Sequence, residues 1–280
     1  MSASQRFPQK TTIVIAAFGG WSDAGETATD TIEHLLEVWD CEEIFEIAPD
    51  NYYDYQFSRP EAAIGLNGER EIIWPGASVY KTSSATLPDT EIYLIQGMEP
   101  SRRWKQFCAE IMNVIPTDHD TVIIGLGAML ADVPHTRPIP INGTTADPVL
   151  QEVTGFESSK YEGPTGILGI LQAECDLVGI SAISLWAAIP HYVANPPCPK
   201  GTLALIRGLE DVLNASIPVA DLVEESRAWQ TGVEELTKDD DDIAEYVRNL
   251  EESQDTAELP EASGEAIAKE FERYLRRRES

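Results

Sequence analysis

Two kinds of apolar pattern alternate along residues 10–217, and together they predict an α/β fold. Short continuous runs rich in β-branched residues, at 11–18 and 121–126, are typical of strands buried on both faces of a sheet. Segments with an apolar residue at every third or fourth position, at 28–39 and 104–115, predict amphipathic helices. Strand, turn, helix and strand therefore follow one another as they do in α/β domains.

The same patterns predict the remaining elements of this region. They are strands at 43–48, 91–96 and 177–187 and a helix at 199–214. Residues 71–74 and 78–80 resemble the strands of a hairpin that turns at Pro75-Gly76. The stretch 129–148 is rich in proline and glycine and is expected to be a long connection, a kind of segment that often carries function.

The composition changes after Pro218, where large apolar residues become sparse and acidic residues dominate. Two helical stripes remain, at Ile243, Tyr246, Val247 and Leu250 and at Ile267, Phe271, Tyr274 and Leu275. Pro260 and Gly264 lie between the stripes and are expected to interrupt the helix. We therefore divide the chain into an α/β core domain, 10–217, and an acidic helical extension, 218–280.

The net charge limits the partners that we expect. Lys and Arg number 20 against 48 Asp and Glu, a net charge of -28 at pH 7. Such a surface repels phosphate backbones and anionic lipid headgroups, so neither nucleic-acid binding nor membrane binding is expected. The charge favours solubility, and attraction to a basic partner is the alternative interpretation.

The cysteines and apolar runs indicate the compartment. The four cysteines are Cys41, Cys108, Cys175 and Cys198, and no two have the Cys-x-x-Cys spacing of a metal or redox site. No apolar run reaches the roughly 18 residues of a membrane span, and the first residues lead into a strand-like run rather than a signal peptide. We expect a reduced, cytoplasmic protein with no metal and no cofactor.

The turn after the first strand, 18–26, has the sequence FGGWSDAGE and is the strongest local feature. It joins a strand to a helix N-terminus, a place that binds anions. A nucleophile elbow built on Ser22 is one interpretation, but Ala24 stands where that motif needs glycine. The alternative is structural, with Asp23 capping the helix and Glu26 reaching back in a capping box.

Two other glycine motifs follow the same logic. Gly125 and Gly127 come after a strand, but the third glycine of a dinucleotide fingerprint is replaced by Leu130. The segment 163–169 (GPTGILG) predicts an anion-binding nest at a helix start, yet it lacks the Lys-Ser/Thr pair of a P-loop. A tight turn and a close helix–strand approach explain these glycines equally well.

The histidines do not have the spacing of metal ligands. They are His34, His119, His135 and His191. His135 and His191 lie on loops after strands, where α/β folds place their sites, and could build one with Asp23 and Arg137. Scattered histidines without a catalytic role are the alternative.

Several of these segments together resemble a known family. They are 16–25 (AAFGGWSDAG), 52–60 (YYDYQFSRP), 134–138 (PHTRP), 163–166 (GPTG) and 190–192 (PHY). In combination they resemble the bacterial branch of the proteasome assembly chaperone family, over about residues 10–215. The acidic helical tail is also typical of that branch.

The resemblance implies a three-layer α/β/α domain with a mixed central sheet, similar to the phosphorylase/hydrolase-like fold. It also implies a homo-oligomer, with a trimer favoured, and a proteasome-related protein partner. Members that dock on the proteasome are expected to end in a hydrophobic residue, a tyrosine and any residue. Here the last residues are Arg278, Glu279 and Ser280, so that docking mode is not expected.

These observations favour a non-enzymatic, oligomeric binding protein that acts in protein complex assembly. The alternative is a small-molecule or nucleotide-binding enzyme, ligase-like or hydrolase-like, that uses the loops at strand ends. A third hypothesis is a structural oligomer built through the C-terminal helices. No catalytic residue is assigned, and the candidate binding residues are Gly19, Gly20, Trp21, Asp23, Tyr52, Tyr55, Arg59, His135, Arg137 and His191.

Overall fold

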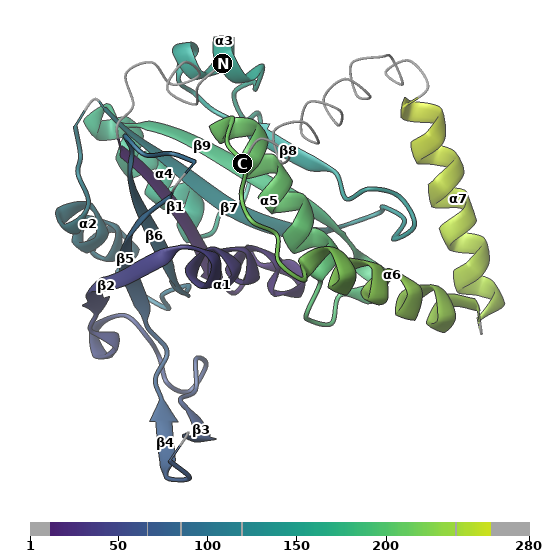
Figure 1. Ribbon diagram of the computed structural model, residues 1–280, viewed down its shortest axis with the longest axis horizontal. Helices are drawn as coiled ribbons and strands as arrows, with labels where there is room; N and C mark the ends of the chain where they lie inside the picture. Colours follow the sequence, from purple (N-terminus) through teal and green to yellow (C-terminus); the bar gives the residue numbers. More distant parts are fainter. Residues whose placement is uncertain (1–11, 66, 85, 119, 239, 259–280) are drawn as a thin grey trace.

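A seven-stranded mixed sheet forms the centre of the molecule in the computed structural model, which describes residues 12–258 except 66, 85, 119 and 239 (Figure 1). The strands are β1 (Thr12–Gly19), β2 (Asp40–Ile47), β5 (Ala77–Ser83), β6 (Glu91–Met98), β7 (Thr121–Ala131), β8 (Ile141–Thr144) and β9 (Ser181–Pro190). Their order is β2-β5-β6-β1-β7-β9-β8. The central strands β6, β1, β7 and β9 are parallel, whereas β2, β5 and β8 pair antiparallel with their neighbours.

Helices cover both faces of this sheet, which confirms the predicted three-layer α/β/α fold. Helices α1 (Thr27–Val38) and α5 (Pro199–Leu213) pack on one face, and α2 (Trp104–Val114) and α4 (Ile167–Val178) pack on the other. Strand β1 shows why the continuous apolar run predicts burial on both sides. Alternate side chains from Ile13 to Ala17 join the first core, and those from Val14 to Phe18 join the second.

An arm leaves the sheet between β2 and β5. Within it β3 (Glu61–Ile64) and β4 (Arg70–Ile73) form a separate two-stranded antiparallel sheet that projects from the body (Figure 1). We call residues 55–76, apart from 66, the arm. The predicted hairpin of 71–74 with 78–80 is therefore wrong, because β4 pairs with β3 and β5 pairs with β2 and β6. An apolar pattern identifies a strand but not its partner.

Three other boundaries differ from the sequence prediction. The apolar run that begins at Leu177 starts in the last turn of α4, and β9 begins only at Ser181. The connection predicted at 129–148 is shorter, because β7 continues to Ala131 and β8 forms an edge strand. A short helix, α3 (Pro148–Thr154), then begins with Asp147 as its N-cap, whose carboxylate accepts two backbone N–H groups.

The extension forms two helices, α6 (Leu222–Lys238) and α7 (Asp241–Glu258), the first of which the sequence analysis missed. Helix α6 packs against α5 and leads away from the body, and α7 returns beside the loops that follow β7 (Figure 1). The first predicted stripe lies on α7, where Val247 is buried. The second, from Ile267 to Leu275, lies outside the described residues. Division into two domains stays a prediction.

Strand β2 forms one outer edge of the sheet and is strongly acidic. Its sequence is DCEEIFEI, and Asp40, Glu42, Glu43 and Glu46 are all exposed. Among the described strands only β5 pairs with it, so no strand of the described part of the chain covers the other side of β2. Elsewhere, none of the helices within the described ranges has the length and apolar character needed to cross a bilayer.

Candidate functional site

The candidate residues fall into three groups around the carboxyl ends of the parallel strands. Gly19, Gly20, Trp21 and Asp23 follow β1. His135, Arg137 and His191 follow β7 and β9, which run side by side. Tyr52, Tyr55 and Arg59 lie where the chain enters the arm. The structure therefore brings His135, Arg137 and His191 together. Asp23, which was expected to join them, instead bonds to the N-terminus of α1.

Asp23 caps helix α1. Its Oδ1 accepts the backbone N–H of Ala28 at 2.6 Å and of Thr29 at 3.3 Å, and its Oδ2 accepts the hydroxyl of Thr29. Burial raises the pKa of Asp23, while these hydrogen bonds act in the opposite direction. The predicted cap is thus present, with Thr29 as the hydroxyl partner where a contribution from Glu26 was expected. The backbone donors that could bind a phosphate at this turn already hold a carboxylate.

A second carboxylate fills the predicted nest at the start of α4. Glu99 follows β6, and its Oε1 accepts the backbone N–H of Ile167 at 2.8 Å. Gly166 permits this approach, since a Cβ there would lie 2.5 Å from the Ser22 hydroxyl and 2.9 Å from the Glu99 carboxylate. The sequence analysis missed Glu99. Its only signal was an acidic residue directly after a strand.

His135 is buried beneath its loop and held by a tyrosine. The Tyr192 hydroxyl accepts the backbone N–H of His135 at 2.7 Å and lies 2.8 Å from Nδ1. Burial lowers the pKa of His135, so the imidazole is neutral at pH 7.

Lys200, at the start of α5, completes this buried group. Its ammonium donates to the carbonyl oxygen of His135 and to Oε1 of Gln230, the latter at 2.7 Å. Burial lowers the pKa of Lys200 to about 8, with nearby Glu234 opposing that shift. Lys200 therefore links α5, the loop after β7 and α6, and both of these hydrogen bonds are made within the chain.

Helix α7 lies across the remaining residues of the second group. The Arg137 guanidinium donates from Nε to Oδ1 and from Nη2 to Oδ2 of Asp255, both at 2.8 Å, and from Nη1 to Glu251 at 3.3 Å. The Thr136 hydroxyl also donates to Glu251. These contacts hold the acidic extension against the loop that carries Thr136 and Arg137. We call them the α7 clasp.

An aromatic contact extends the clasp to His191. The Tyr246 ring on α7 lies 5.6 Å from the His191 ring and 6.0 Å from Tyr192, both edge-to-face. The Tyr246 hydroxyl donates to Asp132 at 3.1 Å, and His191 Nδ1 lies 3.3 Å from the same carboxylate. The loop residues that could have formed an open site are thus partners of the chain's own helix.

The third group has a structural part and an exposed part. Tyr52 is fully buried, its ring lies 5.3 Å from that of Phe107, and its hydroxyl donates to Glu110. Tyr55 donates to Asp50 at 2.6 Å and packs against the Trp74 ring at 4.9 Å, at the base of the arm. Arg59 is exposed. This group anchors the arm to the core.

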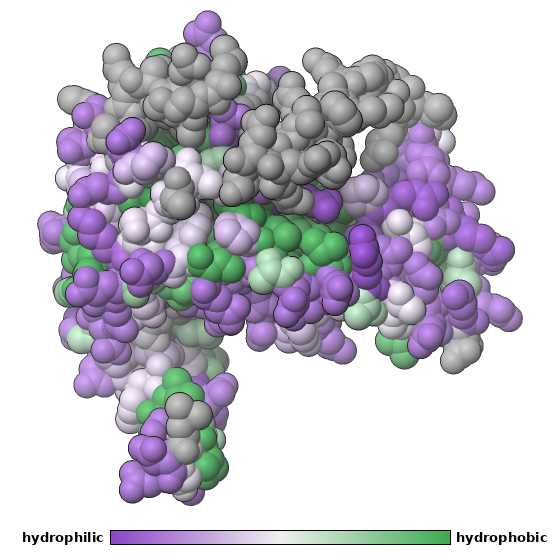
Figure 2. All heavy atoms as spheres, viewed as in Figure 1, coloured by the Kyte–Doolittle hydropathy of each residue, from purple (hydrophilic) through white to green (hydrophobic). Residues whose placement is uncertain are grey.

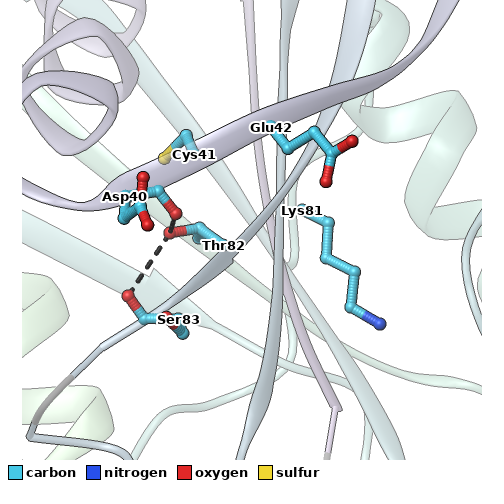
Figure 3. A pocket seen from close by; sticks show the side chains of 6 residues that line it. All are labelled: Asp40, Cys41, Glu42, Lys81, Thr82 and Ser83. Atoms are coloured by element: carbon cyan, nitrogen blue, oxygen red, sulfur yellow. Dashed lines mark hydrogen bonds between the residues drawn. The ribbon is translucent and has the colours of Figure 1, made fainter.

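A shallow hollow of about 350 Å³ lies between β2 and β5, away from all three groups (Figure 3). It is lined by Asp40, Cys41, Glu42, Lys81, Thr82 and Ser83. Lys81 is paired with Glu91 at 2.8 Å, and burial raises the pKa of the Cys41 thiol. Neither side chain is therefore activated as a nucleophile. Among the described residues, no group of three or more His, Cys, Asp or Glu could hold a metal.

Large apolar side chains are exposed at the carboxyl edge of the sheet. They are Trp21, Met98, Met129 and Leu130, which we call the apolar rim. Gly19 pairs with Met98 across β1 and β6, and Asp23 bridges to Ala128 of β7, so all four lie near one stretch of that edge. Exposed apolar clusters of this kind mark interaction surfaces more often than catalytic sites.

The fold and the site define a three-layer α/β protein in which Asp23 and Glu99 occupy the N-termini of α1 and α4. In the same class of protein, helix α7 covers the loops that carry the histidines. The chain belongs to the PAC2 family, whose model matches residues 17–237. This membership confirms the resemblance to proteasome assembly chaperones on the level of the family. No curated protein is significantly similar to the chain.

Two bacterial structures are similar in both sequence and fold. A PAC2 family protein from Streptomyces avermitilis is 43% identical with a TM-score of 0.78, covering 84% of this chain and 99% of its own. A proteasome-assembly chaperone homologue from Mycobacterium tuberculosis is 41% identical with a TM-score of 0.74 and the same coverage. The archaeal proteasome activator PbaB from Pyrococcus furiosus shares the fold at 16% identity and a TM-score of 0.63, over 81% of this chain and 93% of its own.

Proposed function

We propose that this chain is a non-enzymatic, homo-oligomeric binding protein that acts in the assembly of protein complexes. One observation carries the proposal, namely the collection of large exposed apolar side chains on the arm and the apolar rim. On the arm they are Phe57, Ile64, Ile72, Ile73 and Trp74. Exposed apolar side chains that are gathered in this way, on a chain with a net charge of -28, are typical of surfaces that bind another protein.

The state of the candidate chemistry also supports a binding role. Asp23 and Glu99 occupy the two helix N-termini at which a phosphate would otherwise bind. His135 is neutral and buried, and Arg137 is bonded to α7. The nucleotide-binding enzyme considered from the sequence is therefore the less favoured alternative.

For the partner we propose a proteasome-related protein. The support is the printed identity of the Mycobacterium tuberculosis relative, a homologue of a proteasome-assembly chaperone, at 41% identity over 99% of its length. The fold shared with PbaB is consistent with this partner. Cytoplasmic location is part of the same proposal.

Purified proteasome α and β subunits from the same organism provide the test. The full chain is mixed with each subunit, and complexes are followed by size-exclusion chromatography with native mass spectrometry. We expect co-elution with at least one subunit, and weaker co-elution for Trp21→Glu, which places a charge on the apolar rim. Leu177→Glu is the matched control, because Leu177 is 79% exposed at the end of α4. Failure of the chain to bind either subunit would remove the proteasome-related partner.

A further inference from the structure

The two faces of the arm differ in chemistry. In an antiparallel pair, residues directly opposite one another share a face, and the next residue along points the other way. The register pairs Ala62 with Ile72 and Ile64 with Arg70, so these four share one face. The opposite face carries Glu61, Ala63, Glu71 and Ile73. The first face is apolar with one arginine, and the second has two carboxylates.

The apolar face is open to solvent. Ile64 is 72% exposed and Ile72 is 49% exposed. The arm projects from the body, and apolar side chains are visible on it in Figure 2. A lone two-stranded hairpin is marginally stable in water and needs a third layer over its apolar side. The arm therefore has the form of an element completed by another surface.

The charge of the arm indicates which surface covers its apolar face. The arm carries two arginines and three glutamates, a net charge of -1, while the chain carries -28. Its apolar face has Arg70 and no carboxylate. The complementary surface is therefore apolar and acidic at its margin. The apolar rim fits this description, because the edge that carries Met129 and Leu130 also carries the exposed carboxylate of Asp132.

We propose that the apolar face of the arm docks on the apolar rim of a second copy of this chain. The proposal rests on the homo-oligomer in the proposed function and assigns its interface. The arm projects beyond the edge of the sheet at which the rim lies, so it can reach a neighbouring copy (Figure 1). Because arm and rim are different surfaces, the contact is heterologous. Heterologous contacts form a ring when the rotation between copies closes, as in the trimer that the family resemblance favours.

Adjacent isoleucines on the arm give a matched pair of variants. Ile72→Asp puts a charge on the apolar face, and Ile73→Asp makes the same change one residue away on the opposite face. We expect Ile72→Asp to reduce the mass in solution, measured by light scattering, to that of one chain, while Ile73→Asp keeps the wild-type mass. Circular dichroism checks that both variants fold. Loss of the oligomer in both variants or in neither would overturn the proposal, as would a monomeric wild type.

The rim is tested in the same way. Met129→Asp should also give a single chain, while Leu177→Asp, on an exposed side chain at the end of α4, should keep the oligomer. An unchanged oligomer in Met129→Asp would overturn docking on the rim.

Mixing the two monomeric variants separates a heterologous contact from an arm-to-arm contact. The Ile72→Asp chain keeps an intact rim, and the Met129→Asp chain keeps an intact arm. With one variant labelled with ¹⁵N, native mass spectrometry should show mixed dimers and nothing larger, and their absence would overturn the arm–rim pairing. Binding of the wild-type chain to a proteasome subunit is measured separately from these masses, so failure of the interface and failure of the proposed partner are distinguishable.

Discussion

Asp30 lies in the first turn of α1 within a cluster of acidic side chains. Burial, and then the neighbouring carboxylates Glu33, Glu26 and Asp23, raise its pKa from 3.8 to about 7. The folded state therefore holds a proton that the unfolded chain releases near pH 4. The stability that depends on the protonated form is complete below about pH 4 and is lost as the pH rises through 7.

Asp30→Asn should remove this pH dependence. The variant is expected to match the wild type near pH 4 and to exceed its unfolding free energy by about 1–2 kcal/mol at pH 8, after allowance for the screening of a half-buried group. Urea unfolding at pH 4, 6 and 8 measures the difference. Asp89→Asn, at an exposed aspartate, is the control and should show no trend with pH. A constant difference for Asp30→Asn at all three values would contradict the expected shift.

Individual site residues could be predicted from the sequence only as far as local patterns reach. The turn glycines and the Asp23 cap follow from residues at most six positions apart. Glu99 and Ile167 are separated by 68 positions, and no pattern in either segment predicts their hydrogen bond. Arg137 and Asp255 of α7 are separated by 118 positions. Their contact depends on the path of α6, a helix that the sequence analysis missed.

At the scale of the element, α7 is fastened by polar contacts that remain accessible to water. In the pair of Arg137 with Asp255, the side chains are 32% and 52% exposed. Ion pairs of this exposure contribute little to stability and weaken further with added salt. The α7 clasp is therefore weaker than the packing of the core helices, and α7 is expected to open before the rest of the fold.

Arg137→Ala should loosen α7 without unfolding the core. Hydrogen exchange in peptides from 243–256 is expected to accelerate several-fold in the variant, and in the wild type at about 0.5 M salt, because both remove the same ion pairs. Arg227→Ala, on the exposed face of α6, makes the same charge change and serves as the control. Equal exchange in all three proteins would show that the clasp does not hold α7.

The elements themselves were largely predictable, but their partners were not. Strong apolar runs and helical stripes predicted the main strands and helices within a few residues, since burial imposes those periods on the sequence. The misassigned hairpin involving β4 and the missed β3 and β8 have a common cause. Each is a strand of four residues, too short for a period to emerge, and its pairing depends on segments elsewhere in the chain.

For the whole molecule, charge and site occupancy argue against nucleotide binding. At about 1 mM, Mg-ATP and Mg-ADP are expected to shift the melting temperature by less than about 1 °C, because Asp23 and Glu99 already fill the backbone donors. Sodium chloride of equal ionic strength is the control, since a chain with a charge of -28 responds to salt alone. A shift of several degrees specific to a nucleotide would revive the enzyme hypothesis.

The α/β class was predictable because alternating strands and helices leave few ways to bury both faces of a sheet. The three-layer arrangement was expected from the family resemblance. The strand order was not predictable, since it is decided by contacts between distant segments. The projecting arm was also unforeseen, because the strand expected at 71–74 was paired in the prediction with 78–80 and not with β3.

The acidic edge strand β2 limits how these molecules can associate at high concentration. A bare strand edge invites another strand to add to it, and repeated addition gives fibrils. Here a second β2 would bring the carboxylates of Asp40, Glu42, Glu43 and Glu46 against an identical set. Copy-to-copy growth through this edge is therefore suppressed, so the protein is free to expose an apolar arm for finite assembly without polymerising through its sheet.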